Sequence, residues 1–265
     1  MTIEQLKSHA LSARRDIVSM IYESGIGHPG GALSIIDILT WIYDEEVDFS
    51  VSPRARVVMS KGHAVAAQYA MLYQKGIINR SEFSSFRQIN SRLQGHPSIK
   101  SIPEVDATTG LLGQGLSIAF GMAAAKKQHG ENQRVFAIIG DGEMHEGQIW
   151  ETLQQAGHMK IDNLVAIIDY NGFSSHDPVN QVINLEPLAD KIRHFGWHVL
   201  ELHNGNDMHQ VADTLLLSRH LKGKPVAIIA HTTKGCGVSY MENNGDWHSK
   251  TPTTEQYQQA MEELQ

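Results

Sequence analysis

Three short apolar runs constrain the fold of this chain more than any other feature. They are Val-Phe-Ala-Ile-Ile at 135–139, Leu-Val-Ala-Ile-Ile at 164–168 and Val-Ala-Ile-Ile-Ala at 226–230. Each is continuously apolar and rich in β-branched residues, which is typical of strands buried on both faces. Stretches with helical spacing separate them. The alternation predicts an α/β fold built on a doubly wound, mainly parallel sheet.

The rest of the chain fits the same organisation. Apolar residues recur at helical spacing over 3–23, 34–43, 115–128, 147–158, 185–195 and 207–221. The glycines and proline at 23–31 predict a break after the first helix. Residues 87–113 are polar and glycine-rich without a clear period, as is typical of a functional loop. Because no linker or repeat interrupts the chain, we expect one domain over 1–265.

Composition excludes several classes of function. The chain has 265 residues and a formal net charge of −7, which argues against nucleic acid as a main partner. No apolar run approaches the length of a membrane span, and the N-terminus lacks the apolar core of a signal peptide. The single cysteine, Cys236, cannot form an internal disulfide. We therefore expect a cytoplasmic protein with no membrane partner.

Polar residues follow two of the predicted strands. Gly140-Asp141-Gly142 comes directly after the first apolar run, and Asn171-Gly172 follows the second. The carboxyl ends of parallel strands meet at one edge of the sheet, so a carboxylate and an amide oxygen would converge there. These ligands suit a hard cation such as Mg²⁺ or Ca²⁺, and the glycines would let a diphosphate approach the backbone. Taken alone, Gly-Asp-Gly also fits an ordinary turn.

The stretch from Gly140 to Gly172 resembles the thiamine diphosphate motif, which opens with Gly-Asp-Gly and closes with Asn about thirty residues later. The surrounding sequence is similar to the N-terminal half of transketolase. The similar blocks, in order, are SGIGHPGGALS (24–34), SKGHA (60–64), QGHPS (94–98), TTGLLGQGLSIAFGMA (108–123) and HTTKGCGVS (231–239). The resemblance covers nearly the whole chain and implies a thiamine-diphosphate-binding domain.

The resemblance implies roles for the residues of the motif. Asp141, Asn171 and the backbone carbonyl of Phe173 would bind the divalent cation, Mg²⁺ or else Ca²⁺ or Mn²⁺. Gly142 would lie against the diphosphate. The turn formed by Gly113, Gln114 and Gly115 would pass close to the rings of thiamine diphosphate.

Four histidines occupy the similar blocks or follow them. By resemblance, His28, His63 and His96 would line the substrate channel and the diphosphate, and His248 would reach the same site. Other interpretations stay open, because His28 and His96 each precede a proline and fit extended loops, while His63 could cap the following helix.

Two positions depart from the usual pattern of the family. After Asn-Gly the family continues Ile-Ser-Ile-Asp-Gly, whereas this chain has Phe-Ser-Ser-His-Asp at 173–177. Lys234 stands where many full-length relatives carry an apolar residue, and it is either a cation near the diphosphate or a surface lysine.

Glu146 and Glu151 resemble the acids that couple the two cofactor sites at the family's subunit interface. They also fit a helix start, where acids are common. We expect Glu143 and His145 to play no part in the site, with His145 facing solvent.

The chain lacks the second half of a full transketolase, which carries the glutamate that activates thiamine diphosphate. We therefore expect an N-terminal subunit that is active only with a C-terminal subunit, in an α₂β₂ assembly acting on phosphorylated sugars. Two alternatives keep the cofactor: the thiamine subunit of a 2-oxo acid dehydrogenase and a deoxyxylulose-phosphate synthase-like enzyme. A third is a non-catalytic interaction subunit. The sequence does not identify the sugar.

Overall fold

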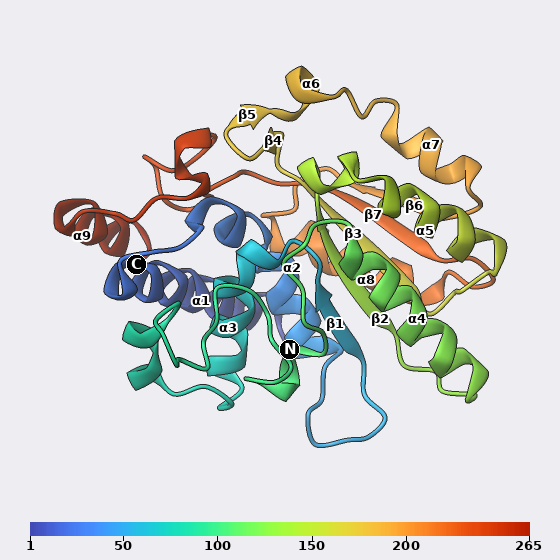
Figure 1. The fold of residues 1–265 in the computed structure, drawn as a ribbon, viewed down its shortest axis with the longest axis horizontal. Helices are drawn as coiled ribbons and strands as arrows, with labels where there is room; N and C mark the ends of the chain where they lie inside the picture. Colours follow the sequence, from blue (N-terminus) through green and yellow to red (C-terminus); the bar gives the residue numbers. More distant parts are fainter.

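The fold is organised around a parallel sheet of five strands (Figure 1), in a computed structural model that describes residues 1–265. The strand order is β1-β2-β3-β7-β6, and all four pairings are parallel. The strands are β1 (Arg56–Met59), β2 (Val135–Gly140), β3 (Leu164–Tyr170), β6 (His198–Leu202) and β7 (Val226–His231). The three apolar runs form the adjacent strands β2, β3 and β7, so the predicted parallel sheet is confirmed.

Helices cover both faces of the sheet because alternate side chains of each central strand point in opposite directions. In β2, Phe136 and Ile138 belong to one buried cluster, whereas Ala137 and Ile139 belong to the other. The first cluster includes residues of α1 (Ile3–Ser24), α2 (Pro29–Glu45), α3 (Val65–Gln74), α8 (Met208–His220) and α9 (Thr254–Glu263). The second includes residues of α4 (Gln114–Gln128), α5 (Gly147–His158), α6 (Val179–Val182) and α7 (Leu188–His194). No helix is long and apolar enough to cross a membrane.

Two helices begin where the sequence analysis did not place them. Helix α2 starts at Pro29 rather than Ser34, because proline suits the first turn of a helix. Gly30 then permits close packing, since a Cβ there would lie 2.9 Å from the carbonyl oxygen of Trp247. Helix α7 starts at Leu188 rather than Leu185, since Pro187 disfavours helical geometry in the residue before it.

The long segment 87–113 is confirmed as a loop with one short 3₁₀ turn at Pro103–Val105. Asp106 anchors it, because its carboxylate accepts hydrogen bonds from Arg54, Arg56 and the backbone N–H of Val57. The loop leads directly into α4. A small hairpin of β4 (Phe173–Ser174) and β5 (Asp177–Pro178) follows β3 and overhangs the same edge of the sheet.

Candidate functional site

A cavity of about 300 Å³ lies at the carboxyl ends of the central strands. This is the edge where ligands bind in doubly wound sheets. The residues that line it come from distant parts of the chain: Gly31, Lys61, His63, Gly110, Leu112, Gly140, Asp141, Gly142, Glu143, Asn171, Phe173, Ser174, Ser175, Lys234 and His248.

The parallel pairing of β2 and β3 brings the expected metal ligands together. Gly140 pairs with Asp169, so the residues that follow each strand meet at one edge. One carboxylate oxygen of Asp141 accepts the N–H of Gly172 at 2.6 Å, and the other accepts the N–H of Gly142 at 2.8 Å. Asn171 follows directly, at the predicted place.

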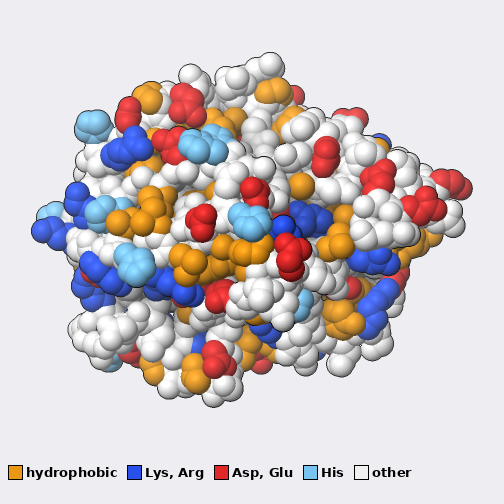
Figure 2. Space-filling model, turned by 180° about the vertical axis from the view of Figure 1, so that it is seen from behind, with side chains coloured by type: hydrophobic (Ala, Val, Ile, Leu, Met, Phe, Trp, Pro, Cys, Tyr) orange, Lys and Arg blue, Asp and Glu red, His pale blue; other side chains and the backbone are white.

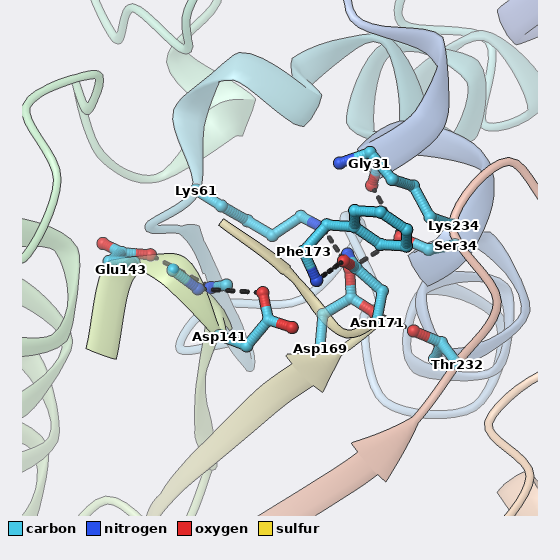
Figure 3. A network of polar contacts seen from close by, with 12 residues as sticks. Gly31, Ser34, Lys61, Asp141, Glu143, Asp169, Asn171, Phe173, Thr232 and Lys234 are labelled. Atoms are coloured by element: carbon cyan, nitrogen blue, oxygen red, sulfur yellow. Dashed lines mark hydrogen bonds and ion pairs between the residues drawn. The ribbon is translucent and has the colours of Figure 1, made fainter. Parts of the chain in front are cut away.

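A buried network surrounds the carboxylate of Asp169, which is 0% exposed (Figure 3). It forms an ion pair with Lys61 and accepts a hydrogen bond from the hydroxyl of Thr232. It also accepts the hydroxyl of Ser34 at 2.6 Å and the amide of Asn171 at 3.2 Å. Sequence reasoning missed Asp169 and Lys61, because each looks unremarkable until the fold joins them.

The environment of Asp141 fits a divalent cation. Asp141 is 1% exposed, and burial, followed by the charge of Asp169, raises the pKa of its carboxyl group to about 7. A nearby cation would favour the ionised form. The set of a carboxylate, the amide oxygen of Asn171 and the carbonyl of Phe173 has the all-oxygen chemistry that Mg²⁺ prefers.

Gly142 leaves no room for a side chain. A Cβ there would lie 2.8 Å from the hydroxyl oxygen and 2.9 Å from the Cα of Ser174, so the β4–β5 hairpin rests directly on this turn. Only glycine lets the two backbones approach in this way. Gly142 thus keeps the hairpin at the edge of the cavity.

Three of the four predicted histidines form a cluster. The ring centroids of His28, His63 and His248 lie 5.0–5.5 Å apart in every pairing. Burial lowers the pKa of His28 to about 4 and that of His248 to about 3, and it also lowers the pKa of His63 well below its usual value. Near neutral pH these rings are uncharged and offer one N–H donor and one acceptor each.

The other two histidines of this region lie outside the cluster of three. His96 is exposed and lies against Gly110, where a Cβ would be 3.1 Å from the Cγ of His96. His176, in the β4–β5 hairpin, has its ring 5.5 Å from that of His248. Sequence reasoning noted His176 only as a departure from the family pattern and assigned it no role.

Lys234 is a buried cation beside the cavity, so the surface interpretation of this residue is wrong. It is 2% exposed, and its ammonium group donates to the carbonyl of Ser175 at 3.1 Å. The Nζ atom also lies 3.4 Å from Nδ1 of His248. Burial, and then the charge of Lys61, lower its pKa to about 8.

Glu143 joins three segments of the site and lines the cavity, so the expectation that it plays no part there is wrong. Its side chain accepts the hydroxyl of Ser60 at 2.5 Å and the backbone N–H groups of Gly113 at 2.8 Å and Gly140 at 3.2 Å. The residue is 2% exposed, and burial raises its pKa. Glu143 therefore ties the end of β2 to the turn before α4.

The turn at Gly113 has a backbone conformation that favours glycine, with φ of +84°. Gly115 is buried, and a Cβ there would lie 2.5 Å from the Cβ of Ser60. Gln114 is exposed and does not line the cavity. None of these three residues lines the cavity, whereas Gly110 and Leu112, just before them in the chain, do.

The outer surface beside the site is exposed and partly apolar. Glu146 and Glu151 are exposed at the start of α5, whereas His145 is half-buried with Nε2 3.0 Å from the carbonyl oxygen of Ile183. This contact lies at the surface, and His145 does not line the cavity. Leu111 is 72% exposed and Leu112 40% exposed.

Elsewhere, hydrophobic side chains gather near the middle of the face opposite to the view of Figure 1, with acidic and histidine side chains among them (Figure 2).

Residues 7–264 match the family described as "Transketolase, thiamine diphosphate binding domain". The chain is 39% identical to one of the subunits of the apulose-4-phosphate transketolase of Phocaeicola vulgatus, over 100% of this chain and 95% of that protein. It is 35% identical to the 6-deoxy-6-sulfo-D-fructose transketolase subunit SqwG of Clostridium sp., over 98% and 96% respectively. The transketolase of Campylobacter jejuni has a similar structure, with a TM-score of 0.93 and 31% identity. That match covers 100% of this chain and 43% of the Campylobacter chain.

Proposed function

The chain belongs to the transketolase thiamine diphosphate binding domain family, and from this premise we propose that it is the N-terminal subunit of a two-chain transketolase. The enzyme transfers a two-carbon ketol unit from a ketose donor to an aldose acceptor. The observation that carries the proposal is the convergence at the ends of β2 and β3, where the N–H of Gly172 donates to Asp141.

We propose that this edge holds Mg²⁺ and the diphosphate of thiamine diphosphate. Asp141, the side-chain oxygen of Asn171 and the carbonyl of Phe173 hold the cation. Gly142 lies beside the diphosphate, and the buried ammonium groups of Lys61 and Lys234 line the same cavity and offset its charge. When bound, thiamine diphosphate supplies the nucleophilic carbon that breaks and re-forms the bond to the two-carbon unit.

The histidines bind and orient the sugar. His28, His63 and His248 are uncharged near neutral pH, so each can donate to one hydroxyl or carbonyl oxygen and accept from another. His96 extends this lining at the loop 87–113. We propose phosphorylated sugars as substrates. Relatives named for apulose 4-phosphate and for 6-deoxy-6-sulfo-D-fructose support a ketose with an anionic group.

A C-terminal subunit completes the site. The relatives of matching length are named as subunits, whereas the chain covers 43% of the transketolase of Campylobacter jejuni. We propose that the partner covers Leu111 and Leu112, which are exposed beside the cavity. The acids Glu146 and Glu151 lie at the contact between the two αβ halves of one assembly, which has α₂β₂ composition. The assembly is cytoplasmic, and residues 1–265 act as one domain.

The test measures cofactor binding and activity separately. Calorimetry measures the binding of thiamine diphosphate, in the presence of Mg²⁺, to the full chain. The measurement is made with and without the C-terminal subunit. We expect ketol transfer only in the mixture. Ketol transfer by this chain alone would overturn the two-chain proposal, and the absence of cofactor binding from the mixture would overturn the proposed site. The measured mass of the complex tests the α₂β₂ composition.

A further inference from the structure

The guanidinium group of Arg87 lies against the histidine cluster and has no acidic partner. Its Nη1 is 3.0 Å from Nδ1 of His28, and no carboxylate lies within ion-pair distance of it. The side chain is half-buried. Burying part of an arginine side chain costs free energy unless its N–H groups donate hydrogen bonds. Its nearest acceptor here is an imidazole nitrogen.

The loop is built to deliver this guanidinium to His28. Arg87 has a φ of +60°, which is rare for a residue with a side chain, and its N–H donates to the carbonyl of Leu93 at 2.8 Å. Gly95 provides the space, since a Cβ there would lie 3.0 Å from Cζ and Nε of Arg87. Strained backbone of this kind is typical of functional sites.

The contact determines which nitrogen of His28 carries the proton. Arginine remains charged and has only donors, so Nδ1 of His28 must accept. The ring is then neutral, with its proton on Nε2. His96, His63, His248 and Lys234 also face this region and none of them supplies a negative charge that would favour an imidazolium.

We propose that Arg87 is a positioning residue that holds His28 as the Nε2–H tautomer, so that the ring presents an N–H donor to an oxygen atom of the sugar. The inference deepens the proposed function and rests on it for the identity of the ligand. A second cation lies beside a histidine of the cluster in the same way: Nζ of Lys234 lies 3.4 Å from Nδ1 of His248. Burial, and then Arg87 among the nearby charges, lower the pKa of His28 to about 4, which accords with a neutral ring.

The test reads the tautomer directly by ¹H–¹⁵N correlation spectra of the full chain with ¹⁵N-labelled histidine at neutral pH. The His28 signals are assigned from the spectrum of His28→Gln. We expect wild type and Arg87→Lys to show the Nε2–H form, and Arg87→Met to show a mixture of both tautomers. Gly95→Ala, which displaces the guanidinium without removing it, should give an intermediate mixture. Arg193→Met, at an exposed site on α7, is the control and should match wild type.

Activity is then measured with the C-terminal subunit. Arg87→Met should lower kcat/KM for the ketose by about tenfold to a hundredfold, as expected for a lost hydrogen bond to a charged group, and Arg87→Lys should recover part of it. A single Nε2–H form in both Arg87→Met and Gly95→Ala would overturn the inference. The spectra need neither cofactor nor partner, so they can fail independently of the proposed function. If Arg87→Met does not fold, the Gly95→Ala spectrum decides.

Discussion

Lys61 and Asp169 form an ion pair whose side chains are only 2% and 0% exposed, although 108 positions separate them in the chain. Lys61 follows β1 and Asp169 lies near the end of β3. Ser34, Asn171 and Thr232 also donate to this carboxylate, so both of its oxygens have at least one hydrogen-bond donor. The pair therefore joins the loop after β1 to the edge that holds Asp141.

Removing one member of this pair should destabilise the fold strongly. Lys61→Met leaves a buried carboxylate without its counter-ion, which costs about 3 kcal/mol, since breaking buried pairs costs about 3–5 kcal/mol and three donors remain here. Urea unfolding of the isolated chain measures the change in free energy. The exposed pair of Lys127 and Asp162 is the control, and Lys127→Met should cost less than about 1 kcal/mol.

A double variant separates the charge from the packing. Lys61→Met combined with Asp169→Asn removes both charges. The double variant should therefore lose less free energy of unfolding than the sum of the losses in the two single variants. Simple additivity would contradict a direct interaction between the two side chains.

Asp141→Asn should abolish metal-dependent cofactor retention while the fold survives. The substitution removes the only carboxylate among the proposed ligands, and an amide oxygen binds Mg²⁺ more weakly. In wild type, cofactor and Mg²⁺ at about 100 times Kd should stabilise the chain by about 2.7 kcal/mol, which a thermal shift detects. In Asp141→Asn this shift should vanish. Asp177→Asn, an exposed acid in the nearby hairpin, is the control. An unchanged shift in Asp141→Asn would refute the metal site.

Sequence reasoning located the parts of the site that depend on strand order. Apolar runs identify buried strands, and parallel strands bring their carboxyl ends to one edge, so Asp141 and Asn171 could be placed together from sequence alone. The resemblance of several blocks then led to His28, His63 and His248, which the fold does gather.

The remainder could not be predicted because it depends on contacts between distant segments. Nothing near Glu143 in the sequence indicates that Ser60 and Gly113 would donate to it. The same holds for Arg87, which reaches His28 only because of an unusual backbone conformation.

Glu143→Gln should loosen the turn before α4. The glutamate accepts three donors, whereas the amide nitrogen of glutamine is itself a donor, so at least one N–H or O–H loses its partner. A buried donor left without a partner costs about 1–3 kcal/mol. Hydrogen exchange of the peptide 110–116 should accelerate in this variant. Glu262→Gln makes the same chemical change at an exposed site and should alter nothing. Faster exchange spread evenly over the chain would indicate general destabilisation instead.

The stability of the chain should depend on pH through Asp16 on α1. One oxygen of this side chain is buried without a hydrogen-bond partner, and burial raises its pKa from 3.8 to about 6. Because the folded state holds the proton more tightly than the unfolded state, ionisation costs stability. The cost is fully present above pH 6 and disappears as the pH falls towards 4. A shift of this size corresponds to about 3 kcal/mol, and partial exposure reduces the expected cost to about 1–2 kcal/mol.

Asp16→Asn should therefore stabilise the chain at pH 8 and leave it unchanged at pH 4, as measured by urea unfolding at both values. Asp48 provides a control of opposite sign, because hydrogen bonds from Ser50 lower its pKa. Its ionised form is the favoured one, so Asp48→Asn should bring no gain at pH 8. A benefit of Asp16→Asn that is equal at pH 4 and pH 8 would rule out ionisation as its cause and would point to packing or helix propensity instead.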